Sequence, residues 1–240
     1  MSTLSDAILV AHRGDAARHP ENSLAAFASA AKLGIDYVEL DVQVTSDGVP
    51  IVLHDDSLAR THNLGVTVTK ATLQKLGMLG VLTGGHHPPA VPRLAEFVEW
   101  MHKTPHMHVF VEIKKESLRV HDRKRVLAAV TQAIEALRGR AVIISYDARV
   151  LAMAKRERWP IGYVLLYMKP RYQVIADRLA PEYLFAEYPQ LLRAGRLWAG
   201  NRDWAAFDLE DIAAAQQVAH LGVRYIETMN PALFIGHLDS

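Results

Sequence analysis

Residues 37–54 read YVELDVQVTSDGVPIVLH, and apolar and acidic side chains alternate through their first part, residues 37–44. This period of two predicts a β-strand, because successive side chains of a strand point to opposite faces. Glu39 and Asp41 then share one face, and the apolar residues between them take the other. We therefore expect this strand to present two carboxylates side by side.

A tight turn is expected in the middle of the same stretch, at Asp47-Gly48. This dipeptide favours a two-residue hairpin, and a turn centred on it would place Asp41 directly opposite His54. Directly opposed residues lie on the same face of a two-stranded ribbon. The hairpin is therefore expected to bring the His54 imidazole beside the two carboxylates.

Short extended segments and longer helical periodicities alternate along the whole chain. The extended segments are residues 7–11, 37–44, 109–113, 142–145, 161–166, 183–186, 196–199 and 223–228. The helical ones are a helix that Ser23 caps and Gly34 ends, followed by residues 94–102, 120–137, 147–157, 172–178, 189–193 and 209–220.

Eight strands separated by helices predict a parallel sheet that closes into a (βα)8 TIM barrel, an α/β fold. The alternative is an open doubly wound sheet, but no G-x-G-x-x-G motif follows a strand to support a dinucleotide site. Residues 1–240 are expected to form a single domain. The segment at about 56–92 is rich in glycine and proline and too long for an ordinary connection. It is expected to be a small inserted cap between the second and third βα units.

The composition excludes several classes of protein. The 240 residues carry 27 Lys and Arg against 26 Asp and Glu, a net charge of +1, and contain no Cys. Such a balance argues against nucleic-acid binding, and the lack of Cys excludes disulfides and thiolate metal sites. No apolar run approaches the ~20 residues of a membrane span. The apolar run 7–11 is too short for a signal-peptide core, so a cytoplasmic location is expected.

The catalytic groups of a TIM barrel lie at the C-terminal ends of its strands. The first expected strand leads into His12 and Arg13, and the third places Glu112 and Lys114 on one face. The barrel mouth is therefore expected to gather these groups with those of the hairpin. The full candidate set is Glu39, Asp41, Glu112, His12, His54, Arg13 and Lys114.

Three carboxylates brought together repel one another unless a cation intervenes. An all-oxygen set favours a hard divalent ion, Mg²⁺ or Ca²⁺, over Zn²⁺. His12 and His54 are suited to acid–base catalysis near neutral pH, and Arg13 and Lys114 supply the positive charge that a phosphate needs. The pattern therefore indicates metal-assisted chemistry on a phosphate ester.

Four stretches of the chain resemble the glycerophosphodiester phosphodiesterase family. They are AHRG (11–14), PENSLAAFASAAKLG (20–34), VELDVQVTSDGVPIVLHDDSLART (38–61) and VEIK (111–114). The resemblance implies a (βα)8 barrel with an inserted cap and one divalent cation, Mg²⁺ or Ca²⁺, with Mn²⁺ a further candidate. It implies hydrolysis of a small glycerophosphodiester to sn-glycerol 3-phosphate and an alcohol.

The resemblance also assigns roles to residues. It implies Glu39, Asp41 and Glu112 as metal ligands, His12 and His54 as the acid and base, and Arg13 and Lys114 as phosphate contacts. Trp198, at the end of an expected strand, is either core or a stacking platform under the glycerol.

Several questions stay open at this point. Where the family has tandem threonines this chain has Thr61-His62, and near the last strand it has Met229 in place of an aspartate. These differences leave the leaving alcohol open, and a lysophospholipase D-like enzyme or a catalytically silent phosphodiester-binding barrel are the alternatives. Neither the metal, nor a cyclic phosphate intermediate, nor the oligomeric state follows from the sequence.

Overall fold

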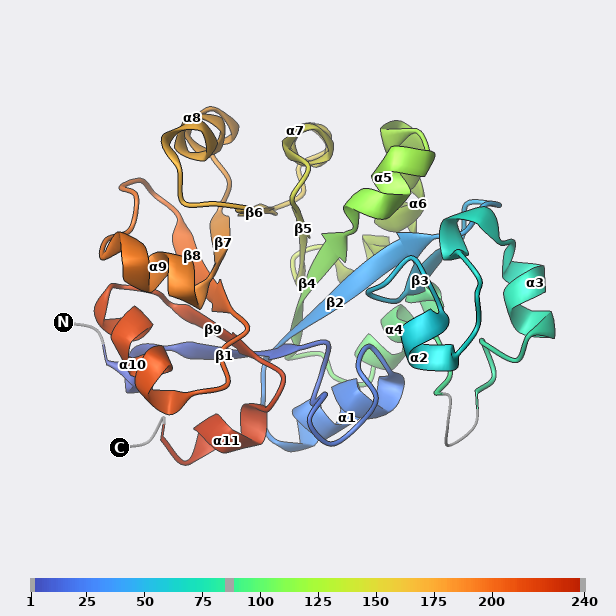
Figure 1. The fold of residues 1–240 in the computed structure, drawn as a ribbon, viewed down its shortest axis with the longest axis horizontal. Helices are drawn as coiled ribbons and strands as arrows, with labels where there is room; N and C mark the ends of the chain where they lie inside the picture. Colours follow the sequence, from blue (N-terminus) through green and yellow to red (C-terminus); the bar gives the residue numbers. More distant parts are fainter. Residues whose placement is uncertain (1–2, 85–88, 238–240) are drawn as a thin grey trace.

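A ring of eight parallel strands forms the centre of the computed structural model, which describes residues 3–84 and 89–237 (Figure 1). Going round the ring, the strands follow the order β1-β2-β4-β5-β6-β7-β8-β9, and β9 pairs with β1 to close it. Their bounds are β1 Ile8–His12, β2 Tyr37–Val44, β4 His108–Ile113, β5 Ala141–Ser145, β6 Ile161–Val164, β7 Tyr183–Glu187, β8 Asp203–Phe207 and β9 Tyr225–Thr228. The expected (βα)8 barrel is confirmed.

Helices surround the ring on the outside (Figure 1). They are η1 Leu4–Asp6, α1 Leu24–Lys32, α4 Leu94–Met101, α5 Lys115–Val120, α6 Arg123–Ile134, η3 Glu135–Leu137, α7 Ala148–Arg156, α8 Pro170–Leu179, α9 Tyr188–Ala194, α10 Ile212–His220 and α11 Pro231–Ile235. The alternation of side chains along each strand separates two cores. Val38 and Leu40 of β2 pack outward against the helices, whereas Val10 and Phe110 fill the interior of the ring.

Two expected elements differ from the structure. Residues 196–199 are not a strand, because Gly195 ends α9 with φ 62° and the chain runs irregularly until β8 begins at Asp203. The long helix expected over 120–137 is divided. His121 has an extended backbone, and the Asp122 carboxylate accepts hydrogen bonds from two backbone amides to begin a new helix, α6.

The hairpin register is wrong by one residue in the sequence-based prediction. The return strand β3, Pro50–Val52, pairs Val42 with Val52 and leaves Asp41 opposite Leu53, whose amide donates to the Asp41 carbonyl. The turn contains three residues rather than two, since the amide of Thr45 bonds to the carbonyl of Val49, and Gly48 adopts φ 87°. His54 therefore lies beyond the paired part of the hairpin.

The segment between β3 and α4 contains α2 Ala59–His62, η2 Val68–Lys70 and α3 Leu73–Met78. A hydrophobic cluster of its own holds it together: Ile51, Leu53, Leu58, Val68, Ala71, Leu76, Val81 and Val91. Of the expected cap at 56–92, residues 85–88 lie outside the described residues, and its action as a cap stays a prediction. Within residues 3–84 and 89–237, no helix has the length and apolar character that crossing a membrane requires.

Candidate active site

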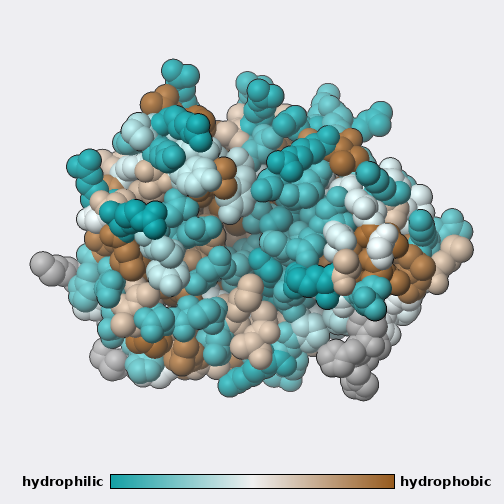
Figure 2. Space-filling view, in the orientation of Figure 1, coloured by the Kyte–Doolittle hydropathy of each residue, from teal (hydrophilic) through white to brown (hydrophobic). Residues whose placement is uncertain are grey.

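The C-terminal ends of the barrel strands surround a cavity of about 130 Å³. Figure 2 shows mainly hydrophilic residues over the middle of this face, in the region that the strands surround in Figure 1. The cavity lining includes the predicted residues His12, Arg13, Glu39, His54, Glu112 and Lys114. Asp41 is buried beside them and contacts Lys114. The structure thus brings together all the predicted site residues except Trp198.

Three carboxylates from two neighbouring strands lie close enough to hold one cation. Glu39 and Asp41 of β2 and Glu112 of β4 each offer an oxygen within 4.8 Å of the others. All three are buried, and an oxygen of Glu39 has no hydrogen-bond partner. Buried carboxylate oxygens without partners are costly unless a cation or proton satisfies them. This donor set therefore fits a hard divalent cation.

The charge state of the three carboxylates differs because their neighbours differ. Burial raises the pKa of Glu112 to about 7 and, together with Asp41 and Glu227, raises the pKa of Glu39 well above its usual range. Burial would also raise the pKa of Asp41, but Lys114 and Arg13 hold it below its usual range. The Lys114 ammonium lies 3.0 Å from Asp41 and 3.2 Å from Glu112. Without metal, Lys114 is the cation between these two carboxylates.

Asn22 orients Asp41, and it is not among the site residues predicted from the sequence. Its Nδ2 donates to Asp41 Oδ2 at 2.9 Å, and its Oδ1 accepts from the Asp41 amide at 3.2 Å. Asn22 reaches this position because it adopts φ 58° just before Ser23, which caps α1. The only signal in the sequence is its place in the stretch 20–34 that resembles the family.

Arg13 follows β1 in a left-handed conformation, with φ 59°. Its Nε lies 3.1 Å from Asp41 and its guanidinium 3.2 Å from Glu21. Glu21 also accepts two hydrogen bonds from Arg60 of α2, at 2.7 and 2.8 Å. The Arg13 side chain is therefore held by carboxylates at the edge of the cavity, and its contact with phosphate stays a prediction.

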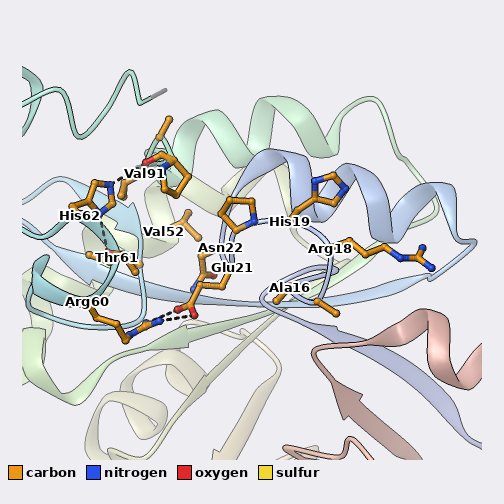
Figure 3. Close-up of a pocket in the computed structure, with 15 residues that line it drawn as sticks. Ala16, Arg18, His19, Glu21, Asn22, Val52, Arg60, Thr61, His62 and Val91 are labelled. Atoms are coloured by element: carbon orange, nitrogen blue, oxygen red, sulfur yellow. Dashed lines mark hydrogen bonds and ion pairs between the residues drawn. The ribbon is translucent and has the colours of Figure 1, made fainter. Parts of the chain in front are cut away.

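A separate cavity of about 410 Å³ lies behind this ion pair, between the β1–α1 loop and the segment that carries α2. Figure 3 shows Arg60 and Glu21 pointing toward each other at its edge, with His62 and Val91 on the side of α2. This cavity and the one at the barrel mouth have none of their lining residues in common.

The two histidines occupy different surroundings. His12 is buried, and burial followed by the nearby Arg13 lowers its pKa to about 3, so its ring is neutral. Its Nε2 lies 3.2 Å from Glu227 and 3.8 Å from Glu39, and its Nδ1 lies 3.4 Å from Asp208.

His54 is about one third exposed, and its Nδ1 lies 2.7 Å from Asp55 Oδ1. Arg60 donates to the other oxygen of Asp55 at 2.7 Å. The Asp55 carboxylate therefore fixes one ring nitrogen of His54 and leaves the other free.

Three further acids line the cavity and were not predicted from the sequence: Glu187, Asp208 and Glu227. Glu227 is 3% exposed, and its Oε2 has no hydrogen-bond partner. Burial raises its pKa well above the usual range, and Asp208 adds to the shift. The signal was present, because Glu227 stands two residues after Tyr225, whose side chain faces the barrel interior.

Trp198 lies away from the site. It precedes the N-terminal end of β8, whereas the cavity lies at the C-terminal ends of the strands. Its ring packs edge-on against Trp204, with 5.7 Å between centroids. The expectation that Trp198 stands at the end of a strand is wrong, and its contacts are those of a packing residue.

Comparison with known proteins identifies the family of the chain. The model of the glycerophosphoryl diester phosphodiesterase family matches residues 12–202. The chain belongs to this family. A Mycobacterium tuberculosis protein named "Probable glycerophosphodiester phosphodiesterase 1" is 31% identical, over 93% of this chain and 89% of its own. The family resemblance and the enzyme class, a phosphodiesterase, are confirmed.

Solved structures show the same fold. An Oleispira antarctica phosphodiesterase, solved in complex with the product sn-glycerol-3-phosphate, superposes with a TM-score of 0.80 at 23% identity, covering 97% of both chains. A glycerophosphodiester phosphodiesterase from Thermotoga maritima gives a TM-score of 0.76 at 22% identity, covering 96% of this chain and 98% of its own.

Proposed function

We propose that this member of the family hydrolyses glycerophosphodiesters to sn-glycerol 3-phosphate and an alcohol, with one divalent cation and two histidines. The observation that carries the proposal is the convergence of Glu39, Asp41 and Glu112 on one cavity that His12 and His54 also line. The Oleispira relative, whose structure contains sn-glycerol-3-phosphate, supports the assignment of the product.

Glu39, Asp41 and Glu112 are the residues that would hold the cation. A divalent ion held there would supply positive charge beside a phosphate oxygen and would balance the negative charge that develops in the reaction. Lys114 and Arg13 flank the same carboxylates and are the side chains available to bind the other phosphate oxygens. Asn22 keeps Asp41 in place through two hydrogen bonds.

The two histidines suit opposite proton transfers. The neutral ring of His12 can accept a proton from the attacking hydroxyl, either of water or of the substrate. The Asp55 carboxylate lies 2.7 Å from His54 Nδ1 and orients the ring, and we assign to His54 the donation of a proton to the leaving alkoxide.

The leaving alcohol is proposed to be small and polar. A cavity of about 540 Å³ adjoins the site and has His54, Glu112, Lys114 and Tyr146 in common with it. Its remaining lining is mostly polar or charged: Asp55, Asp56, Ser57, Ala59, Arg60, Lys115, Glu116 and Leu166. The charged ends of these side chains offer hydrogen-bond partners to a polar alcohol, and an acyl chain cannot use them. Val81, an apolar residue of the expected cap, is buried in that segment's own core and lines neither cavity.

The test is the release of sn-glycerol 3-phosphate from glycerophosphocholine by protein stripped with a chelator. We expect no release without metal and recovery when Mg²⁺, Ca²⁺ or Mn²⁺ is added. Lysophosphatidylcholine is the comparison substrate, and faster choline release from it would overturn the preference for a polar alcohol. Tight binding of glycerophosphocholine without turnover in all three metals would overturn the enzymatic assignment.

A further inference from the structure

A second group of ligand-type side chains lies beside the three carboxylates. His12, Glu39 and Glu227 come from β1, β2 and β9, and β1 lies between the other two strands. Each offers a ligand atom within 4.8 Å of the others. His12 Nε2 is 3.2 Å from Glu227 Oε1 and 3.8 Å from Glu39 Oε2. Donors around a tetrahedral ion with bonds of about 2.0 Å are about 3.3 Å apart, so this spacing suits one metal ion.

Unsatisfied atoms in this group point to a missing positive charge. Glu227 is 3% exposed, and its Oε2 and the Glu39 Oε1 have no hydrogen-bond partner. Among the described residues, no lysine or arginine forms an ion pair with Glu227, because Arg13 and Lys114 are paired with other carboxylates. A buried carboxylate without a cationic partner is unfavourable unless it takes up a proton or a cation. A cation bound here would remove that cost.

The surroundings of His12 are compatible with a role as metal ligand. With Nε2 turned toward the two glutamates, Nδ1 faces the Asp208 carboxylate at 3.4 Å without forming a hydrogen bond to it, so this contact must shorten when a metal binds. Metal-bound histidines usually donate their other ring N–H to a carboxylate or carbonyl, which fixes the ring and the tautomer.

We propose that His12, Glu39 and Glu227 form a second cation site, selective for a borderline ion such as Zn²⁺, and that an ion bound there inhibits the enzyme. One imidazole nitrogen with two carboxylate oxygens is a donor set that zinc accepts, unlike the all-oxygen set nearby, which suits Mg²⁺ or Ca²⁺. Glu39 belongs to both groups and has two oxygens, so it can bridge two ions. The inhibition rests on the proposed function, because a bound ion would occupy the His12 lone pair that the proposed proton transfer needs. The existence of the cation site does not rest on the proposed function.

The first experiment counts bound zinc in chelator-stripped protein by equilibrium dialysis and elemental analysis. Wild type is expected to bind two equivalents and Glu227→Gln one. Glu187→Gln is the matched control, because Glu187 lines the same cavity but belongs to neither group, and it should bind two. Equal stoichiometry in wild type and Glu227→Gln would overturn the proposal.

The second experiment needs no substitution. X-ray absorption at the zinc edge of wild type loaded with two equivalents should show scattering from an imidazole ring in the shell of about half the zinc. Oxygen-only coordination of all the zinc would overturn the proposal, even if a Glu227 variant failed to fold.

The third experiment measures inhibition of glycerophosphocholine hydrolysis by Zn²⁺ at saturating Mg²⁺. The half-inhibiting Zn²⁺ concentration should rise at least about tenfold in Glu227→Gln and stay unchanged in Glu187→Gln. An unchanged value in Glu227→Gln would refute the inhibitory role. If the protein hydrolyses no glycerophosphodiester at all, the proposed function fails, while zinc stoichiometry and absorption still decide whether the second site exists.

Discussion

The side chain of Asn22 makes two hydrogen bonds with Asp41, one to the carboxylate at 2.9 Å and one from the backbone amide at 3.2 Å. A residue of the β1–α1 loop thereby fixes both the position and the orientation of a candidate metal ligand on β2. The loop is part of the site's framework, and the geometry of the carboxylates depends on it.

Asn22→Ala should lower the free energy of unfolding by about 2–4 kcal/mol. The substitution removes the acceptor of the buried Asp41 amide and one of the hydrogen bonds to the Asp41 carboxylate, and it puts Ala at φ 58°, a conformation that Asn tolerates better. Urea denaturation measures the loss. Asn63→Ala is the matched control, since Asn63 is exposed and adopts φ 53°, so it reports the backbone effect alone. Equal losses in the two variants would contradict a role for the Asp41 bonds.

Glu112→Gln should raise the Mg²⁺ concentration needed for half-maximal activity at least about tenfold, because an amide replaces one of three carboxylate ligands. Activity against metal concentration is the measurement. Glu116→Gln, in the N-terminal part of α5 nearby, should leave the curve unchanged. A Glu112→Gln variant with the metal dependence of wild type would remove Glu112 from the metal site.

His12→Ala and His54→Ala should each reduce kcat about 10²–10⁴-fold at saturating metal, because each removes a proton-transfer group. Steady-state kinetics with glycerophosphocholine measures the effect. His19→Ala, at the separate cavity of Figure 3, should keep wild-type activity. Full activity in either of the first two variants would refute its assigned role.

His62 should make the stability of the α2 segment depend on pH. Its Nε2 hydrogen-bonds the Pro89 carbonyl and its Nδ1 the Thr61 hydroxyl, an arrangement that the neutral ring satisfies. Burial lowers the pKa of His62 below its usual value of about 6.5. The folded protein thus binds the proton less tightly than the unfolded chain, so this stabilisation is present above pH 6.5 and is lost as the pH falls below it.

The measurement compares wild type with His62→Gln by urea denaturation at pH 7.5, 6.5 and 5.5. The stability advantage of wild type should shrink as the pH falls, and the contributions of the other histidines cancel in the difference. A difference that stays constant over this range would show that His62 does not titrate with unfolding.

The barrel could be predicted because its strands and helices have different apolar periods, and the strand over residues 37–44 is found with the expected bounds. The prediction of a strand at 196–199 was wrong because Leu197 and Trp198 are apolar residues of a loop that packs against the core. Apolar residues of such a loop follow neither the strand nor the helix period. The hairpin register failed because Asp47-Gly48 suits both turns. Gly48 has a positive φ in either one, and only Asp47, which does not adopt the positive φ of a two-residue type I′ turn here, distinguishes them.

The candidate site could be predicted where residues stand close together in sequence, as Glu39, Asp41 and His54 do. Glu227 could also have been found, because the predicted closure of the barrel places its last strand beside the first strand, which leads into His12, and Glu227 stands two residues after Tyr225, which faces the interior. The position of Asp208 depends on its own left-handed backbone just after β8, and no residue pattern predicts that conformation.

Arg60 connects parts of the chain that leave different strands. Its Nε donates a hydrogen bond to Asp55, which contacts His54. Its two terminal nitrogens donate to Glu21, which contacts Arg13. Loop grafting aimed at new substrates must therefore preserve this exposed arginine. A transplanted 56–92 segment without this arginine would lose the hydrogen bonds that hold Asp55 and Glu21, even if its own hydrophobic cluster packed well.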